Sequence, residues 1–311
     1  MSTLNNPIYL SMLVQKYFCT YLLNQRRVSQ HTIAAYRDMF RLLLPFLAKA
    51  YKKTVPSLLL TDLDAAHTLD FLQYIECERG NRVRTRNARL AAIRSFLNYA
   101  VIEQPECAHD IQRVMCIPQK RFDRTLIECL EKTEIEAILN APDPSTWTGR
   151  RDHLLLLTLY NTGARVSEIV RVQRQDVDIQ QQQTVHLHGK GRKERIIPLW
   201  PKCVVALRHW LQLLDAAPNT PVFQGRFGHA LTRSGVRQRL DCAVQKATKV
   251  CASLQHKNIS PHTLRHTTAL HLLQSGVDLS VIALWLGHEH IDTTHQYMEA
   301  NLEIKKQHWL R

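Results

Sequence analysis

One short stretch near the end of the chain, SPHTLRHTTALHLL at residues 260–273, carries four groups that can donate protons or bind anions. On a helix, His262 lies on the same face as Arg265 and His266, because the spacings are three and four residues. Packing a helix does not require such side chains. An arginine suits a phosphate because its planar guanidinium matches two oxygens, and histidine moves protons near neutral pH. The stretch therefore points to a bound negative charge.

Two earlier stretches hold groups of complementary chemistry. YNTGARVSEIVRV at 160–172 places Arg165 where a helix begins, three residues before Glu168. GKGRKER at 189–195 is the tip of a predicted β-hairpin, and its glycines let Lys190 project from a tight turn. Taken alone, the first stretch is a surface ion pair of little energetic value, and the second is a solvated turn.

A fourth stretch supplies a possible nucleophile. ALWLGHEHIDTTHQYME at 283–299 places His288 directly after a glycine that ends a helix, and Tyr297 follows nine residues later. Most tyrosines in such a position are amphipathic core residues. Beside two arginines, a lysine and histidines, however, a tyrosine hydroxyl can attack a phosphate once its proton is removed. The four stretches together indicate phosphoryl transfer in which side chains supply the cations.

Composition limits the class of partner. The chain of 311 residues has a formal net charge of +14, which favours a polyanion such as nucleic acid or an anionic membrane surface. It contains no apolar run long enough to span a membrane and no secretory signal pattern at its start. Eight scattered cysteines without a C-x-x-C pair predict reduced, mostly buried thiols in the cytosol.

The elements that must position these groups are mainly helical. In the first third, Ser29 can cap an amphipathic helix that Pro45 should kink or end, and two more helices follow. Periodicity lapses around residues 104–125, and helices resume beyond it apart from one hairpin. We therefore predict an N-terminal helical domain, a linker and a catalytic domain, at residues 1–112, 113–125 and 126–311.

The motifs TG-A-R-VSE, GKGRKER, H-T-L-R-H, LGH and a tyrosine nine residues later occur in the order seen in the tyrosine recombinases, the phage integrase family. The chain resembles this family over nearly its whole length, and the Xer-type and transposon-borne members most. The resemblance implies a mainly α fold with a small antiparallel β-sheet, in which a SAM-like core-binding domain and a catalytic domain form a C-shaped clamp on DNA.

The resemblance also implies a reaction and its residues. The enzyme would cut and rejoin DNA through a 3′-phosphotyrosine intermediate and exchange strands via a Holliday junction, with no metal, cofactor or ATP. Integration, excision or transposition of a mobile element and resolution of replicons are all open as its role. His266 is expected to pack or to bond to backbone. The implied roles are as follows: Arg165 and Arg265 hold the scissile phosphate, Tyr297 attacks it, His262 accepts the tyrosine proton, Lys190 protonates the leaving oxygen, His288 hydrogen-bonds the phosphate, and Glu168 orients Arg165.

Partners and location are implied in the same way. The substrate would be double-stranded DNA with inverted core sites, bound by a homotetramer, or a heterotetramer with a related recombinase, on two duplexes. The apolar tail at 302–311 would dock into a neighbouring protomer. We expect a bacterial cytoplasmic protein at the nucleoid, without membrane association. The predicted DNA contacts are Arg82, Arg84, Arg86, Arg89, Arg94, Lys193 and Arg195.

Three other functions fit part of the sequence. A type IB topoisomerase uses similar chemistry to relax supercoils, and a non-catalytic DNA-binding factor would share the basic charge. A metallohydrolase could use His262 and His266 as zinc ligands, but Thr263 stands where the motif H-E-x-x-H has its glutamate.

Overall fold

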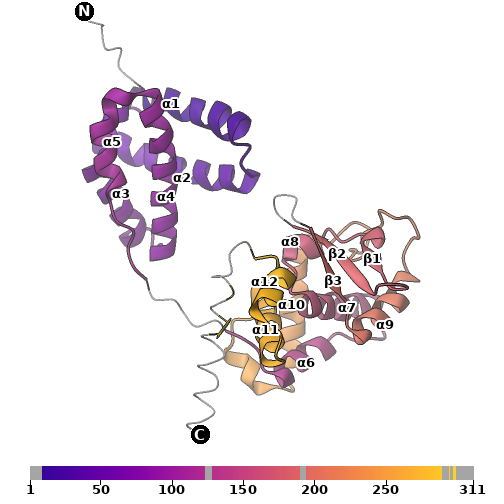
Figure 1. Ribbon diagram of the computed structural model, residues 1–311. Helices are drawn as coiled ribbons and strands as arrows, with labels where there is room; N and C mark the ends of the chain where they lie inside the picture. The colour runs from indigo at the N-terminus through magenta and orange to yellow at the C-terminus, as the bar shows by residue number, and fades with distance from the viewer. Residues whose placement is uncertain (1–8, 123–127, 190–193, 289–293, 295–296, 299–311) are drawn as a thin grey trace, which may run out of the picture. The chain divides into compact units, whose positions relative to one another are not determined.

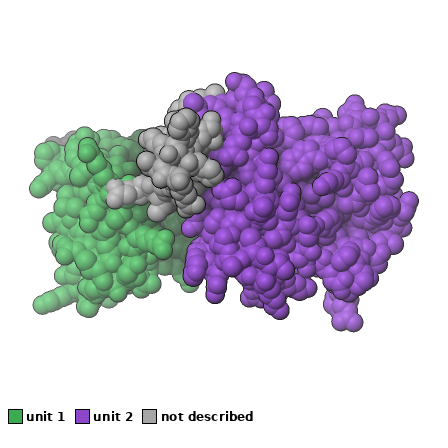
Figure 2. Space-filling model, turned by 90° about the horizontal axis from the view of Figure 1, so that it is seen from below, with its two compact units in different colours: residues 1–124 green, residues 125–311 purple. Residues whose placement is uncertain are grey.

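The computed structural model describes residues 9–122, 128–189, 194–288, 294 and 297–298. The chain divides into two compact units, residues 1–124 and 125–311 (Figure 1 and Figure 2). The division falls within the predicted linker. The predicted domain end at residue 112 lies inside a helix, because the last helix of the first unit continues to Met115 and its Ile111 and Val114 are buried.

The first unit is a helical bundle around one apolar core. Ser29 caps the second helix by accepting a hydrogen bond from the Thr32 N–H at 3.2 Å. This helix does not end at Pro45 but continues to Ala50. The last long helix lies at the centre and buries Leu90 and Phe96. The elements are α1(Leu10–Lys16), the π-helical η1(Tyr17–Gln25), α2(Gln30–Ala50), the 3-10 turns η2(Val55–Ser57) and η3(Leu60–Asp62), α3(Ala65–Cys77), α4(Val83–Glu103), η4(Pro105–Cys107) and α5(Ala108–Met115).

The second unit packs helices around a core that α7 crosses. Residues 154–159 of α7 are buried on all sides, and α7 packs against α9 and α11. A three-stranded antiparallel sheet of order β1-β2-β3 lies beside α8, and its strand β3 contacts α12 (Figure 1). The elements are α6(Lys132–Asn140), α7(Trp147–Thr162), α8(Val166–Ile169), η5(Arg174–Asp176), β1(Val177–Asp178), β2(Thr184–His188), β3(Glu194–Pro198), α9(Pro201–Leu211), α10(Arg233–Ala247), η7(Ala252–His256), α11(Pro261–Gln274) and α12(Leu279–Leu286).

Two features of the whole chain, its lack of membrane-spanning helices among the described residues and the burial of its cysteines, can be compared with the expectations from sequence. None of the described helices combines the length and apolar character that a membrane crossing requires. All eight cysteines are free thiols, but the prediction that most are buried is wrong, since Cys203 is the one buried among them. The four exposed thiols lie in helices or directly after one, and the other three are partly buried.

The arginines predicted to contact DNA along α4 differ in how far they are buried. Arg86 is 4% exposed, donates to the Pro118 carbonyl at 3.3 Å and lies 3.6 Å from the Glu76 carboxylate. Arg94 donates to the Ile117 carbonyl. These two arginines therefore fasten the segment after α5 to α4, and their contact with DNA stays a prediction.

The remaining arginines of this group stay accessible. Arg82 and Arg84 are exposed, and the Arg84 guanidinium lies 5.6 Å from the centre of the Phe122 ring. Arg89 is partly buried, and burial, followed by the charge of Arg79, lowers its pKa. Contact with phosphates thus stays a prediction for these three side chains.

We expect Arg86→Ala to lower the free energy of unfolding by about 1–3 kcal/mol, because buried acceptors lose their donor. Arg84→Ala is the matched control and should change stability by less than about 0.5 kcal/mol. Urea denaturation of the two variants measures the difference. Equal stability losses would contradict the structural role assigned to Arg86.

Candidate active site

Three arginines meet at the C-terminal end of α12. Arg195 Nε donates to the Trp285 carbonyl at 2.9 Å. Arg265 Nη2 donates to the Leu286 carbonyl at 2.7 Å, and Arg165 Nη2 to the Gly287 carbonyl at 3.3 Å. The last carbonyls of a helix lack partners within it and carry the negative end of its dipole. Three consecutive carbonyls therefore hold guanidinium groups from three distant parts of the sequence.

A buried carboxylate completes this cluster. Glu168 is 2% exposed and accepts from Arg195 Nη2 at 2.7 Å, from Arg165 Nη1 at 3.0 Å and from the Arg165 backbone N–H at 2.8 Å. Burial by itself raises the pKa of Glu168, but the hydrogen bonds and charge of Arg195, then those of Arg165, outweigh it and lower the pKa below 4.5. Glu168 is thus ionised at neutral pH and holds the Arg165 side chain in place.

Arg195 has a different place from the one predicted. Its side chain is 11% exposed and bound to Glu168, so in this structure it is an internal support, and its contact with DNA stays a prediction. Strand alternation could have shown this, because Arg195 shares the inward face of β3 with the buried Ile197, whereas Ile196 between them is 60% exposed.

Glycines let the helix ends approach each other. Gly163 ends α7 and Gly287 ends α12, both in the left-handed conformation with φ of +58° and +67°. A Cβ on Gly163 would lie 2.4 Å from Leu286 Cδ2. The Gly163 carbonyl accepts from Arg265 Nη1 at 2.6 Å, so Arg265 joins the ends of both helices.

Arg265 itself is 4% exposed. Burial, then the charges of Arg165 and Arg195, lower its pKa to about 10, so it stays charged at neutral pH. A guanidinium has five N–H donors, so donors remain beyond the two given to carbonyls. The side chain of Arg165 is 38% exposed and can reach a ligand from solvent.

Tyr297 lies within the same cluster and is fully buried. Its hydroxyl is 2.9 Å from His266 Nδ1. This contact differs from the expectation that His266 packs or bonds to backbone. Burial, then the nearby His262 and Arg265, lower the pKa of His266 to about 4, so this ring is neutral and can accept the tyrosine hydrogen bond.

Two further histidines border the tyrosine cluster. The His288 ring is nearly parallel to the Tyr297 ring, at 13° and 6.3 Å between centres, and its Nδ1 is 2.9 Å from Thr294 Oγ1. Burial, then Arg265 and Arg165, lower the pKa of His288 to about 4. His262 is exposed, and burial of part of its ring, then Arg265 and Arg165, lower its pKa as well.

The structure thus brings together six of the predicted site residues around the end of α12. The predicted acid Lys190 and the predicted DNA contact Lys193 lie outside the described residues. Arginines that can hold a phosphate lie beside neutral histidines and a tyrosine hydroxyl. Together these groups can attack a phosphodiester. The six residues are Arg165, Glu168, His262, Arg265, His288 and Tyr297.

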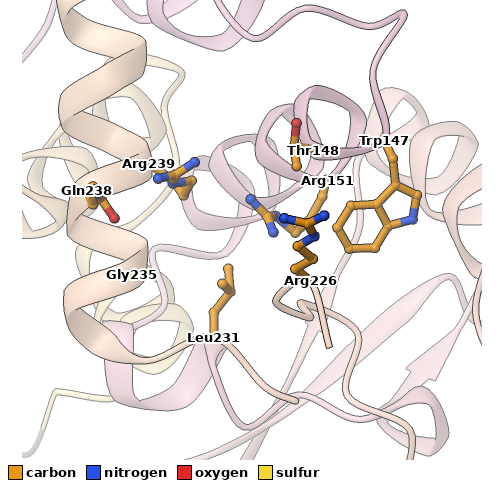
Figure 3. Close-up of a pocket in the computed structure, with 8 residues that line it drawn as sticks. All are labelled: Trp147, Thr148, Arg151, Arg226, Leu231, Gly235, Gln238 and Arg239. Atoms are coloured by element: carbon orange, nitrogen blue, oxygen red, sulfur yellow. The ribbon is translucent and has the colours of Figure 1, made fainter. Parts of the chain in front are cut away.

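A separate hollow of about 630 Å³ lies between α7 and α10. In Figure 3, Arg151 and Arg226 lie beside the Trp147 ring, and Arg239 projects from α10. The Arg151 guanidinium is 5.4 Å from the centre of that ring. None of the six site residues lines this hollow. Among the six site residues, His262 is exposed and the Arg165 side chain is 38% exposed, whereas Arg265 and Tyr297 are buried.

Known proteins share both units. The profile of the phage integrase family matches residues 128–303, and that of the phage integrase N-terminal SAM-like domain matches residues 16–104. A Sinorhizobium fredii protein named as an integrase/recombinase is 43% identical over 96% of this chain and 90% of its own length. The tyrosine recombinase XerC of Chlamydia muridarum is 32% identical over 93% and 94%.

Solved structures share the fold. The Tn1549 transposon integrase in complex with a circular intermediate DNA has a TM-score of 0.72 at 15% identity, covering 97% of this chain and 100% of the other. XerH site-specific recombinase bound to palindromic difH substrate has a TM-score of 0.72 at 21% identity, covering 99% and 91%.

The buried position of Glu168 predicts a pH-dependent contribution to stability. Its folded pKa is lowered, so this contribution is complete above the ordinary value of 4.5 and is lost as the pH falls through the folded pKa. Glu168→Gln should lower the free energy of unfolding by about 3–5 kcal/mol at neutral pH, because two arginines lose their partner.

Below the folded pKa the wild-type carboxyl is itself protonated, so the two proteins should converge in stability. Urea denaturation over a pH series tests this. A difference that stays constant down to the lowest pH would show that folding does not lower the pKa of Glu168.

Proposed function

Because the chain belongs to the phage integrase family of tyrosine recombinases, we propose that it cuts and rejoins double-stranded DNA at specific sites through a covalent bond to Tyr297. The observation that carries the proposal is the meeting of Tyr297, Arg165, Arg265 and His288 at the end of α12. Each of these groups has a task in transferring a phosphoryl group.

In this proposal the two arginines hold the non-bridging oxygens of the scissile phosphate. Arg265 is fixed by two carbonyls and Arg165 by Glu168 and the Gly287 carbonyl. Fixed donors stabilise the charge that develops in the transition state without reorganising during the reaction. His288 adds a hydrogen bond to the same phosphate.

We assign different tasks to His262 and His266 of α11. With a pKa of about 4, His266 is a weak base at neutral pH, and a general base is most effective with a pKa near the working pH. His266 therefore holds the buried tyrosine hydroxyl before DNA binds. The exposed His262 accepts the proton when Tyr297 attacks, and the tyrosine must leave its buried position to reach the phosphate.

Rejoining follows from the chemistry of the intermediate. Attack leaves a 3′-phosphotyrosine and a 5′-hydroxyl, whose oxygen Lys190 would protonate as it departs. The phosphotyrosine bond retains the energy of the broken phosphodiester, so a 5′-hydroxyl from another strand can displace the tyrosine without ATP. Holding the strands in one complex makes this second attack effectively intramolecular, and two rounds would pass through a Holliday junction.

The proposed assembly is a tetramer on two DNA duplexes with inverted core sites, in which the two units of each protomer clamp the DNA and the tail at 302–311 docks into a neighbour. These tail residues lie outside the described residues. The net charge of +14 supports a DNA partner. Transposition or integration of a mobile element in the bacterial cytoplasm is the biological role we favour, since relatives named integrase and transposon integrase share the sequence or the fold.

Relaxation of supercoils by the same chemistry, as in a type IB topoisomerase, is the second candidate. The observation that allows it is the active site itself, because both reactions use a tyrosine and paired arginines. Exchange of strands between two DNA sites distinguishes the recombinase. A non-catalytic DNA-binding factor leaves the clustered Tyr297, Arg165 and Arg265 without a purpose.

Tyr297→Phe should retain DNA binding and lose all cleavage, because the change removes the nucleophilic oxygen alone. Denaturing gel electrophoresis of labelled DNA after incubation with each protein measures the covalent adduct. We expect an adduct with the wild-type protein on DNA carrying a nick near the cut site, which traps the intermediate. An adduct formed by Tyr297→Phe would reject Tyr297 as the nucleophile.

His262→Ala should slow cleavage by roughly 10²–10⁴, the usual contribution of a general base. His266→Ala should retain most of the cleavage rate, because it removes a hydrogen bond of the resting state. Single-turnover cleavage rates of the two variants, each with its DNA affinity measured, make the comparison. A larger loss in His266→Ala than in His262→Ala would transfer proton acceptance to His266.

A further inference from the structure

A second group of chemically active side chains lies on the sheet of the catalytic unit. His186 and His188 are two residues apart on β2, so they share one face of the strand, and their ring centres are 4.5 Å apart. Asp176 of η5 lies beside them, with its Oδ1 3.1 Å from His188 Nε2. One possible ligand atom from each of the three residues lies within 4.8 Å of the others.

The surroundings of these residues orient them. The second oxygen of Asp176 accepts from the Gln173 backbone N–H at 2.8 Å, which fixes the carboxylate. Glu194, opposite His188 on β3, has Oε1 3.1 Å from His188 Nδ1 and Oε2 3.1 Å from His186 Nε2. If each histidine donates one N–H to Glu194, its other ring nitrogen keeps a lone pair.

We propose that Asp176, His186 and His188 bind a zinc ion, with Glu194 as the outer carboxylate that orients both imidazoles. Two imidazole nitrogens and a carboxylate oxygen are a ligand set that zinc accepts, and three protein ligands leave one position for water or another group. A carboxylate that accepts the second N–H of a ligand histidine is the usual support of such a site. The active-site residues described above do not include any of the four.

The location of the proposed zinc site implies that a bound ion would stabilise the catalytic unit. The ion would join η5 to β2, and β2 leads directly into residues 189–193, which contain the proposed acid Lys190. Part of a hollow of about 440 Å³ is lined by Asp176 and His188, so an ion can enter from solvent. Zinc would then stabilise the catalytic unit, and it would do so in the absence of DNA, independently of the function proposed above.

The alternative is a cluster held by a proton. Asp176, then Glu194, raise the pKa of His188, and a protonated His188 could bridge the two carboxylates with no metal. Metal titration separates the two cases, because ligand groups must be deprotonated to bind an ion. The experiment is therefore run at about pH 8, where the histidines give up their protons to a metal.

A chelator first removes metal from the full chain, which carries no histidine tag. The protein is then titrated with Co²⁺, whose visible absorption reports its coordination, and Zn²⁺ is added afterwards to displace the Co²⁺. We expect one equivalent with no thiolate-to-cobalt charge-transfer band, and a higher melting temperature with Zn²⁺. Affinity should fall by more than about tenfold in His186→Gln/His188→Gln and in Asp176→Asn, and by about tenfold in Glu194→Gln, the usual effect of an outer ligand. His209→Gln, an exposed histidine elsewhere, is the control and should bind as the wild type.

Unchanged affinity in the ligand variants, a thiolate band, or less than one equivalent would overturn the proposal. Because a variant could fail to fold, circular dichroism of each metal-free protein accompanies the titration. A second reading uses the wild-type protein alone: Zn²⁺ should shift the ring NMR signals of two histidines together at one equivalent. The absence of such a shift would leave a proton-held cluster and reject the metal site.

Discussion

The end of helix α12 holds the active-site cations together. Its carbonyls at Trp285, Leu286 and Gly287 accept hydrogen bonds from Arg195, Arg265 and Arg165 in turn. A helix end has unsatisfied carbonyls and a partial negative charge, so it can offset the repulsion among guanidinium groups that would otherwise separate. Displacing this helix end would therefore disturb all three arginines at once.

The charge balance of the cluster determines the protonation states around it. Three arginines lie around one buried carboxylate, Glu168, which binds two of them, and the excess positive charge acts on the neighbouring histidines. It contributes to lowering the pKa of Arg265 to about 10 and that of His288 to about 4, after the larger effect of burial. Near neutral pH the arginine is therefore charged and the histidine is neutral, so the site offers positive charge to an anion while the imidazole can donate or accept a hydrogen bond.

Similar arginines do different work in this protein. Arg84 and Arg86 are two residues apart on α4, yet the first is exposed and the second is buried against Glu76 and the Pro118 carbonyl. Arg195 faces inward although it follows a basic tip. In each case the neighbouring groups in the folded protein, and not the residue type, determine whether an arginine is free to bind a ligand or is held in an internal ion pair.

The sequence alone predicted the motifs and the chemistry of their side chains. Each motif depends on local geometry: a glycine ends a helix, or an arginine precedes a glutamate by three residues at the start of one helix. The cap that Ser29 provides and the hairpin of β2 and β3 could be predicted for the same reason, because both depend on residues close together in the sequence. The bond between His266 and Tyr297, the inward position of Arg195 and the cluster of Asp176 with His186 and His188 join residues on different elements. The periodicity of side chains along the sequence cannot predict the distances between residues on different elements. These distances depend on how helices and strands pack, so only the tertiary structure determines them.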